Sequence, residues 1–245
     1  AGIFGGQPGA MVNQRMGRRV LSPGAYPQRG RPDDPAELGG SWVTFGPKPG
    51  MMPMAAGDVF AVSWQGGGGV GDPLDRDPEL VWRDVRDGVI STEHARDVYG
   101  VIGSGGIDAM ATSAHRLDVR RRRLGGREPQ EAVAAGPADA GLPLGPSLRL
   151  HNADGTWEVR SAGHLLVRGT TAWRSAARSV AIDDPELHPG LALTAWYCPF
   201  TGRQLAVDVH ERDAPPTDDI AIDLEGLVAP IADHRDVEEM TVDAV

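Results

Sequence analysis

The chain has 245 residues with 33 glycines, 20 prolines and only 5% aromatic residues, so we expect many turns and extended loops around a thin core. Its net charge of −10 argues against nucleic acid and anionic membranes as partners, because both require a positively charged face. A single cysteine, Cys198, excludes an internal disulfide framework. There is no run of about 20 apolar residues and no basic-then-apolar leader, so the expected compartment is the cytoplasm.

The N-terminal part is rich in glycine and proline, and organised structure is expected to start only at Gly57. Residues 1–9 contain no helix cap and no periodic apolar run, which is typical of a segment flanked by more protein. A short apolar piece follows at residues 42–45. Residues 57–65 then alternate two sets of side chains, which predicts a strand with one well-buried face.

Two short helices are predicted after a glycine-rich loop. Asp77 is a natural N-cap for the first helix, with Pro78 at its first position, and Gly88 ends it. Ser91 caps the second helix, which Gly100 ends. The apolar stripe of the first helix is expected to contain Leu80, Val81 and Val85, and that of the second Ala95, Val98 and Tyr99.

A third, more polar helix is expected over residues 103–124, preceded by a turn at Gly103-Ser-Gly-Gly106. Residues 125–147 hold Ala, Gly and Pro with few large apolar side chains, which is typical of a semi-extended linker. The following region, 148–225, is predicted to be β-rich, with a hairpin turning at Asp154-Gly155 and a second pair of strands at 191–197 and 204–209. The tail, 226–245, is acidic and poorly periodic.

The glycine loop formally fits a dinucleotide-binding pattern, G-x-G-x-x-G, at Gly66, Gly68 and Gly71. That fingerprint requires a helix to open at once, but Asp72-Pro73 and Asp75 follow and place carboxylates where phosphate would lie. We therefore interpret the loop as a structural turn. The alternative is a loop that borders the active site of a partner subunit.

Other charged groups allow a structural and a chemical interpretation. The basic run Arg120–Arg123 is expected to be a solvated helix end, with phosphate contact as the alternative. The acidic residues of the helical region are expected to cap helices or face solvent, and the histidines there to lie on the surface. The acidic set is Asp75, Asp77, Asp84 and Asp87, and the histidines are His94 and His115.

Residues 1–123 resemble the C-terminal end of the hydantoinase B family, which includes N-methylhydantoinase, 5-oxoprolinase and the acetone and acetophenone carboxylases. The matching motifs are Gly2-Ile-Phe-Gly-Gly-Gln-Pro-Gly9, Gly57-Asp-Val-Phe60, Gly66-Gly-Gly-Gly-Val-Gly-Asp-Pro-Leu-Asp-Arg-Asp-Pro-Glu-Leu80, Val85-Arg-Asp-Gly-Val-Ile-Ser91 and Ala95-Arg-Asp-Val-Tyr-Gly100. The large subunit of that family is several hundred residues long, and its metal and substrate residues lie upstream of the matching part. The resemblance therefore implies a detached C-terminal portion with the catalytic centre on another polypeptide.

Residues 148–225 resemble the small zinc-binding gamma subunit of acetone carboxylase. The motifs are Gly163-His164, Trp173, His188-Pro189, Trp196-Tyr-Cys-Pro-Phe-Thr-Gly202, Leu205-Ala-Val-Asp-Val209 and Asp218-Asp-Ile220. The resemblance implies two cysteine pairs around a structural zinc, but these positions are Arg160, Ala162, Cys198 and Thr201. Because tetrahedral zinc needs four soft or imidazole ligands, we expect a degenerate knuckle held by packing. A metal set of Cys198 with His164, His188 and His210 is the alternative, and a nucleophilic Cys198 a further one.

The sequence thus predicts a mainly β chain with short helices (α+β): a hydantoinase-B-like region at 1–124, a linker at 125–147, a gamma-like module at 148–225 and a tail at 226–245. We expect no catalytic, cofactor or metal residues on this chain. The resemblance implies an accessory subunit of an ATP-dependent carboxylase, with hydantoinase-A-like and hydantoinase-B-like partners that carry ATP and a divalent metal. A subunit of an ATP-dependent hydantoinase (a cyclic-amide hydrolase) and a non-enzymatic assembly module remain the alternatives.

Overall fold

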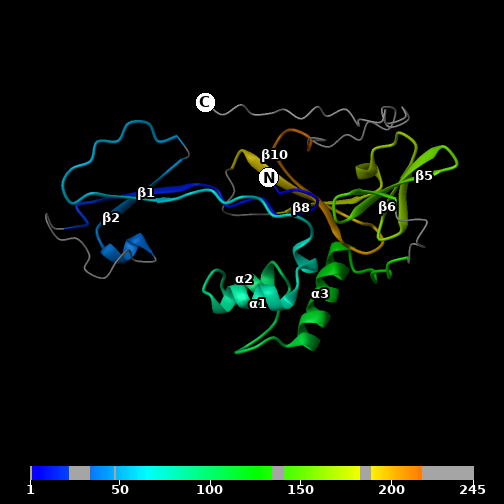
Figure 1. Ribbon diagram of the computed structural model, residues 1–245. Coiled ribbons are helices and arrows are strands. Elements are labelled where there is room, and N and C mark those ends of the chain that lie inside the picture. Colours follow the sequence, from blue (N-terminus) through cyan, green and yellow to red (C-terminus); the bar gives the residue numbers. More distant parts are fainter. Residues whose placement is uncertain (1, 22–33, 47, 134–140, 183–188, 217–245) are drawn as a thin grey trace, which may run out of the picture.

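A computed structural model covers residues 1–245 and describes residues 2–21, 34–46, 48–133, 141–182 and 189–216. These residues form three antiparallel β-sheets and three α-helices (Figure 1). The prediction of a mainly β chain with short helices is confirmed. No helix among the described residues has the length and apolar character needed to cross a lipid bilayer.

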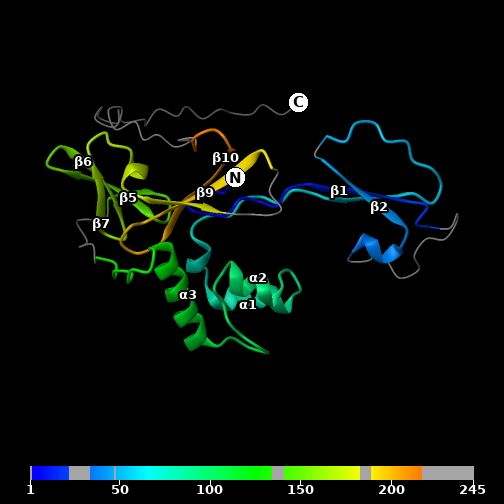
Figure 2. The ribbon, with the colours of Figure 1, turned by 180° about the vertical axis from the view of Figure 1, so that it is seen from behind.

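The first sheet is an arm that projects away from the rest of the molecule (Figures 1 and 2). Its strands are β1 (Asn13–Arg18), β2 (Ser41–Phe45) and β3 (Val59–Ser63), in the order β2-β1-β3. A short 3₁₀ turn, η1 (Pro35–Leu38), precedes β2 and is capped by Asp34. The strand predicted at 57–65 is confirmed as β3, but its predicted well-buried face is wrong, because no residue of β3 is buried and Trp64 is 78% exposed. The expectation that organised structure starts only at Gly57 is also wrong, since β1 and β2 precede it.

The helices form one group to one side of the β-structure (Figure 1). They are α1 (Pro78–Arg86), α2 (Thr92–Asp97) and α3 (Ala109–Arg123), preceded by the 3₁₀ turn η2 (Pro73–Asp75). The predicted caps are confirmed, because Asp77 accepts a hydrogen bond from the Glu79 backbone amide and Ser91 accepts one from His94.

The turn predicted at residues 103–106 is confirmed, but one residue of the predicted apolar stripe and the predicted start of the third helix are wrong. Leu80 is 41% exposed, and Trp82 joins Val81 in the buried stripe of α1 instead. The third helix begins only after Asp108, whose side chain accepts a hydrogen bond from the Ala111 amide. The preceding residues form a turn closed by a bridge between Gly103 and Ile107, because glycines at 103, 105 and 106 do not favour a helix.

The C-terminal half contains two sheets. One has the order β4-β5-β6-β7, with β4 (Leu142–Leu144), β5 (Leu148–Ala153), β6 (Thr156–Ser161) and β7 (His164–Arg168). The other has the order β10-β9-β8, with β8 (Arg178–Ile182), β9 (Leu191–Tyr197) and β10 (Gln204–Glu211), and a 3₁₀ turn η4 (Trp173–Ser175) lies between the sheets in the chain. The predicted hairpin and the predicted strand pair are confirmed.

The predicted division into two modules and a linker stays a prediction, but two observations bear on it. Residues 142–144, within the predicted linker, form β4 and pair with β5. The N-terminal segment also contacts the second half, since a Cβ on Gly145 would meet the Phe4 ring at 2.3 Å. The two halves are therefore packed together within the described residues.

The buried apolar residues form separate clusters in the helices and in the C-terminal sheets. The helical cluster is Val81, Trp82, Ala95 and Val101. One sheet cluster contains Leu148, Leu150, Val159, Val167, Trp173, Cys198 and Leu205, and the other Leu193, Ala195, Tyr197 and Val207. No comparable cluster forms in the described part of the arm, where Met16 is the one buried large side chain.

Candidate functional site

The glycine loop lies alongside the N-terminal glycine segment. The Ile3 amide donates to the Gly69 carbonyl (2.9 Å), and the Gly69 amide donates to the Gln7 carbonyl (2.9 Å). A Cβ placed on Gly6 would lie 1.9 Å from the Gly69 carbonyl oxygen, so only glycine fits there. Of the three predicted loop residues, Gly66, Gly68 and Gly71, only Gly71 has a positive φ (75°). The close approach of the two backbones therefore requires glycine at Gly6 and Gly9 of the N-terminal segment, whereas a Cβ on Gly66 or Gly67 of the loop would meet no atom closer than 3.6 Å.

Asp72 follows this loop and joins three segments of the chain through one carboxylate. Its side chain is fully buried, caps η2 by accepting from the Leu74 amide (3.0 Å), and pairs with Arg123 of α3 (2.7 Å). It also accepts a hydrogen bond from the Gln204 amide of β10 (2.9 Å). The Gln204 side chain in turn donates to the Gly5 carbonyl (2.7 Å). The glycine segments, α3 and β10 therefore meet at Asp72.

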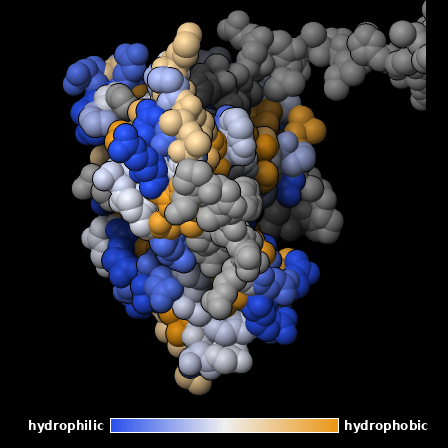
Figure 3. Space-filling model, turned by 90° about the vertical axis from the view of Figure 1, so that its left-hand side faces the viewer, coloured by the Kyte–Doolittle hydropathy of each residue, from blue (hydrophilic) through white to orange (hydrophobic). Residues whose placement is uncertain are grey.

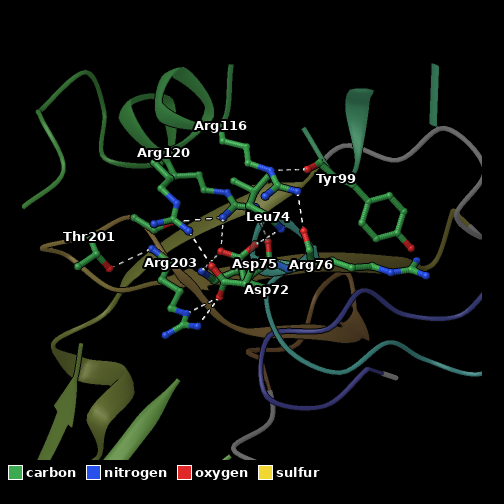
Figure 4. Close-up of polar contacts among 12 residues, drawn as sticks. Asp72, Leu74, Asp75, Arg76, Tyr99, Arg116, Arg120, Thr201 and Arg203 are labelled. Carbon is green, nitrogen blue, oxygen red and sulfur yellow. Dashed lines mark hydrogen bonds and ion pairs between the residues drawn. The ribbon is translucent and has the colours of Figure 1, made fainter. Parts of the chain in front are cut away.

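Asp75 makes a second, more accessible node beside the first (Figure 4). Its carboxylate binds Arg120 of α3 at 2.7 Å through one oxygen and Arg203 at 2.5 Å through the other. Arg116, one helical turn before Arg120, donates to the backbone carbonyls of Tyr99 (3.0 Å) and Arg76 (2.7 Å). Burial lowers the pKa of Arg116, and the neighbouring Arg120 adds to this shift. We name Asp72, Asp75, Arg116, Arg120, Arg123, Arg203 and Gln204 the junction cluster.

The prediction that the basic run of α3 is a solvated helix end is wrong for Arg120 and Arg123 but holds for Arg121 and Arg122, whose side chains are 39% and 63% exposed. Arg120 and Arg123 bind the two aspartates, while Arg121 pairs with Glu128 (2.9 Å) and Arg122 with Asp118 (2.9 Å). The Arg123 guanidinium also lies 5.0 Å from the centroid of the Tyr197 ring. Burial raises the pKa of Tyr197. The prediction that Asp84 faces solvent is likewise wrong, since its side chain is only 17% exposed and pairs with Arg76 at 2.5 Å, whereas Asp75 is exposed as predicted.

A groove of about 800 Å³ lies beside the junction cluster. Its wall includes the backbone of both glycine segments, Tyr99 and His94 of the helical region, and Ile182 and Leu193 of the second sheet. The Tyr99 ring is 5.7 Å from the His94 ring and 5.2 Å from the Arg76 guanidinium. The wall also includes Asp72, Asp75, Arg76 and Arg203, which take part in the ion pairs described above. These pairs fix the positions of the glycine loop, the helices and the β9–β10 turn relative to one another.

The four positions of the degenerate knuckle lie in or beside two strand connections. Cys198 is fully buried among Leu148, Leu150 and other core residues, and its amide donates to the Arg203 carbonyl (2.8 Å). Thr201 is buried in the same β9–β10 turn, where its hydroxyl accepts from the Arg203 amide (3.3 Å). Ala162 has a φ of 50° in the β6–β7 turn, and Arg160 binds Glu158 (2.6 Å). This donor set does not fit tetrahedral zinc.

Residues 130–133 and a ring stack connect the β6–β7 turn to the β9–β10 turn. The His164 ring stacks on Phe200 with centroids 4.7 Å apart and a 14° interplanar angle. The Gln130 amide donates to the Phe200 carbonyl (2.9 Å), and the Val133 amide donates to the Ala162 carbonyl (2.9 Å). Contacts of this kind can replace a metal that would otherwise bridge two turns.

The alternative metal set combines Cys198 with His164, His188 and His210, and three of these four residues lie in the part of the chain that the structure describes. His164 Nε2 lies 2.9 Å from the Glu131 carbonyl, and His210 Nε2 lies 3.0 Å from the Thr194 hydroxyl. His188 lies outside the described residues. Among the described residues, no three His, Cys, Asp or Glu side chains are grouped so that they could hold a metal ion.

Comparison with known proteins gives two short local similarities, and no family model matches the chain. The chain is 38% identical over 73 residues to the acetone carboxylase alpha subunit of Xanthobacter autotrophicus, which is 27% of this chain. It is 53% identical over 53 residues to caprolactamase subunit beta of Pseudomonas jessenii, which is 21% of this chain. In each case the chain spans only 9% of the relative's own length. Both relatives are named as subunits, and the first belongs to the carboxylase group that the sequence motifs resemble.

Two buried carboxylates in the second half, Glu158 and Asp208, form ion pairs that were not predicted. Glu158 is 1% exposed and binds Arg160 (2.6 Å) and Arg168 (2.7 Å), and the Arg160 guanidinium lowers its pKa most. Asp208 binds Arg174, whose guanidinium lies 5.5 and 5.3 Å from the rings of Trp173 and Trp196. Opposite charges on adjacent strands could have indicated the Glu158–Arg168 pair if the strand at 164–168 had been predicted, because Glu158 lies opposite Arg168 in the register.

Proposed function

We propose that this chain is an accessory subunit of a multisubunit ATP-dependent carboxylase of the acetone or acetophenone carboxylase type. The observation that carries the proposal is the local similarity to subunits of two different multisubunit enzymes, acetone carboxylase and caprolactamase. The motifs of residues 148–225, which resemble the gamma subunit of acetone carboxylase, favour carboxylation.

The junction cluster supports a structural role for this chain. Asp72 and Asp75, the acidic residues directly after the glycine loop, bind arginines of α3 and the β9–β10 turn. They therefore hold the hydantoinase-B-like and gamma-like parts together. In this proposal the chain presents both parts as one body to the hydantoinase-A-like and hydantoinase-B-like subunits, which carry ATP, the divalent metal and the catalytic residues.

A second candidate is a subunit of an ATP-dependent cyclic-amide hydrolase. The observation that favours it is the higher identity, 53%, to caprolactamase subunit beta, an enzyme named after a cyclic amide. The two candidates share the same architecture and the same kinds of partner, and they differ only in the substrate of the complex.

Reconstitution of the complex with and without this chain tests the proposal. We expect ATP-dependent incorporation of labelled bicarbonate into an acid-stable product from acetone or acetophenone, and at least a tenfold lower rate when the chain is omitted. ATP-dependent opening of caprolactam in place of carboxylation would establish the second candidate. If omission changes neither rate, the proposed role is wrong and a non-enzymatic assembly module becomes the better account.

A further inference from the structure

The groove beside the junction cluster has the size and the mixed lining of a small-molecule site. Its volume of about 800 Å³ lies within the range of roughly 300–1,000 Å³ that is typical of ligand pockets. Apolar side chains of the wall come from the glycine loop, the end of α2 and the second sheet: Val70, Val98, Ile182 and Leu193. Figure 3 shows apolar and polar side chains interspersed over the surface on the side of the arm, and the groove gathers both kinds around one volume.

The junction cluster has an excess of positive charge. It contains four arginines but only two aspartates, so its formal charge is +2, although the whole chain has a charge of −10. Asp75 is shared by Arg120 and Arg203. Arg116 donates to two backbone carbonyls and pairs with no carboxylate in the described part of the chain, while Asp77 acts on it only at longer range. The excess stays positive when Asp77 is counted with the cluster.

The donors of the cluster are also incompletely satisfied. Arg120 Nε is buried, and no acceptor among the described residues lies within hydrogen-bond distance of it. An unpaired buried donor and an uncompensated charge both cost free energy. An anion bound nearby would offset the excess charge, so the electrostatics of the cluster favour a negatively charged ligand over a neutral one.

Two guanidinium groups on the groove wall have donors left for such a ligand (Figure 4). Arg203 binds Asp75 through Nε and Nη2, and its Nη1 makes no hydrogen bond to the described residues. Arg76 binds Asp84 through Nη2 only. Both arginine side chains are partly exposed, whereas the Asp72 carboxylate on the same wall is fully buried and presents no charge to the groove.

We propose that the groove binds a small organic anion, whose carboxylate pairs with Arg203 and whose apolar body packs against Ile182 and Leu193. A carboxylate fits because its two oxygens match the planar donor fork of a guanidinium. The inference goes beyond the proposed function and does not depend on it, since the groove is formed by this chain alone.

Three probes separate the charged and the apolar part of the site in NMR titrations of the full chain. Benzoate has a carboxylate and an apolar ring, benzamide has the same shape without the charge, and acetate has the charge without the ring. We expect benzoate to shift the amide signals of Val70 and Val98 saturably, with a Kd at least tenfold lower than that of benzamide or acetate. Equal affinity for benzoate and either of the other probes, or no saturable shift with benzoate, would overturn the proposal.

Two pairs of variants locate the binding. Arg203→Gln removes the proposed partner of the carboxylate, and Arg122→Gln removes an arginine of α3 that is not part of the groove wall. Val70→Glu adds a negative charge to the wall, and Val89→Glu adds the same charge outside it, at a valine of similar exposure (67% and 71%).

We expect Arg203→Gln and Val70→Glu to raise the Kd of benzoate at least tenfold, and the two control variants to change it less than twofold. The exposed valine pair decides the question if Arg203→Gln does not fold. An unchanged Kd for Val70→Glu, or equal effects of Val70→Glu and Val89→Glu, would show that the anion does not bind in the groove.

Discussion

Asp72 illustrates how single residues organise this molecule and why sequence alone did not reveal it. Its partners, Arg123 and Gln204, are 51 and 132 residues away, so no local pattern relates them. By contrast, the caps at Asp77 and Ser91 and the turn at Asp154-Gly155 were predicted correctly, because each depends on neighbouring residues only.

Replacing Asp72 tests the importance of the buried node. Asp72→Asn keeps an oxygen that can cap η2 but leaves the Arg123 charge uncompensated, so we expect a loss of about 3–5 kcal/mol in the free energy of unfolding. Asp97→Asn is the control, since the Arg96–Asp97 pair is exposed and should contribute less than about 1 kcal/mol. Urea unfolding measures both, and equal losses would show that the junction cluster does not stabilise the fold.

Asp58 allows a test by pH. Hydrogen bonds from the backbone amides of Ala55 and Arg19, followed by the Arg18 side chain, lower its pKa from 3.8 to about 2. Because the folded-state pKa is depressed, this carboxylate stabilises the arm above pH 4, and its contribution is lost as the pH falls towards about 2. The amide shifts of Ala55 and Arg19 in NMR spectra should titrate with a midpoint near that value. A midpoint near 3.8 would contradict the hydrogen-bonding described.

Cys198 is predicted to serve packing and not metal binding. The purified protein should contain zinc far below one equivalent, and Cys198→Ser should leave that content unchanged. The same substitution should cost about 1–3 kcal/mol, because it buries a hydroxyl in an apolar core. Elemental analysis and thermal unfolding measure the two effects. Near-stoichiometric zinc that is lost on this substitution would restore His164 as a candidate ligand.

At the level of elements, the sequence pattern predicted β5, β6, β9 and β10 of the C-terminal sheets but not β4, β7 or β8. Leu191–Tyr197 has buried alternate positions and was placed correctly, and Gln204–Glu211 extends two residues beyond its predicted end at Val209. β1 was missed because its sequence, NQRMGR, has only one large apolar residue. It forms a strand because β2 and β3 pair with it on both sides. Tertiary pairing, and not intrinsic preference, determines this element.

The packing of the N-terminal glycine segment (residues 2–9) against the glycine loop (residues 66–71) can be tested by substitution. Gly6→Ala places a methyl group against the Gly69 carbonyl, so the segments must move apart, which should cost about 1–3 kcal/mol. Gly67→Ala is the matched control, because nothing lies within 4 Å of a Cβ at that position. Denaturant unfolding should give a clearly lower free energy of unfolding for Gly6→Ala than for Gly67→Ala. Equal stability would mean that the close backbone packing is not required.

At the level of the whole molecule, the described residues form a body and an arm that differ in burial. The helices and C-terminal sheets have buried clusters, while the arm has one large buried side chain. Composition anticipated a thin core, because glycine and proline are abundant. The projection of the arm was not predictable, since it depends on which strands pair and on which segments meet at the junction cluster.

The most direct test of the account is native mass spectrometry of this chain after mild affinity purification from its natural source. We predict one assembly in which the chain is present together with hydantoinase-A-like and hydantoinase-B-like polypeptides, at a fixed stoichiometry. The isolated chain should be less stable than the chain in that assembly, because an obligate interface commonly buries more than ~2,000 Å². A monodisperse monomer that copurifies with neither polypeptide would contradict the account.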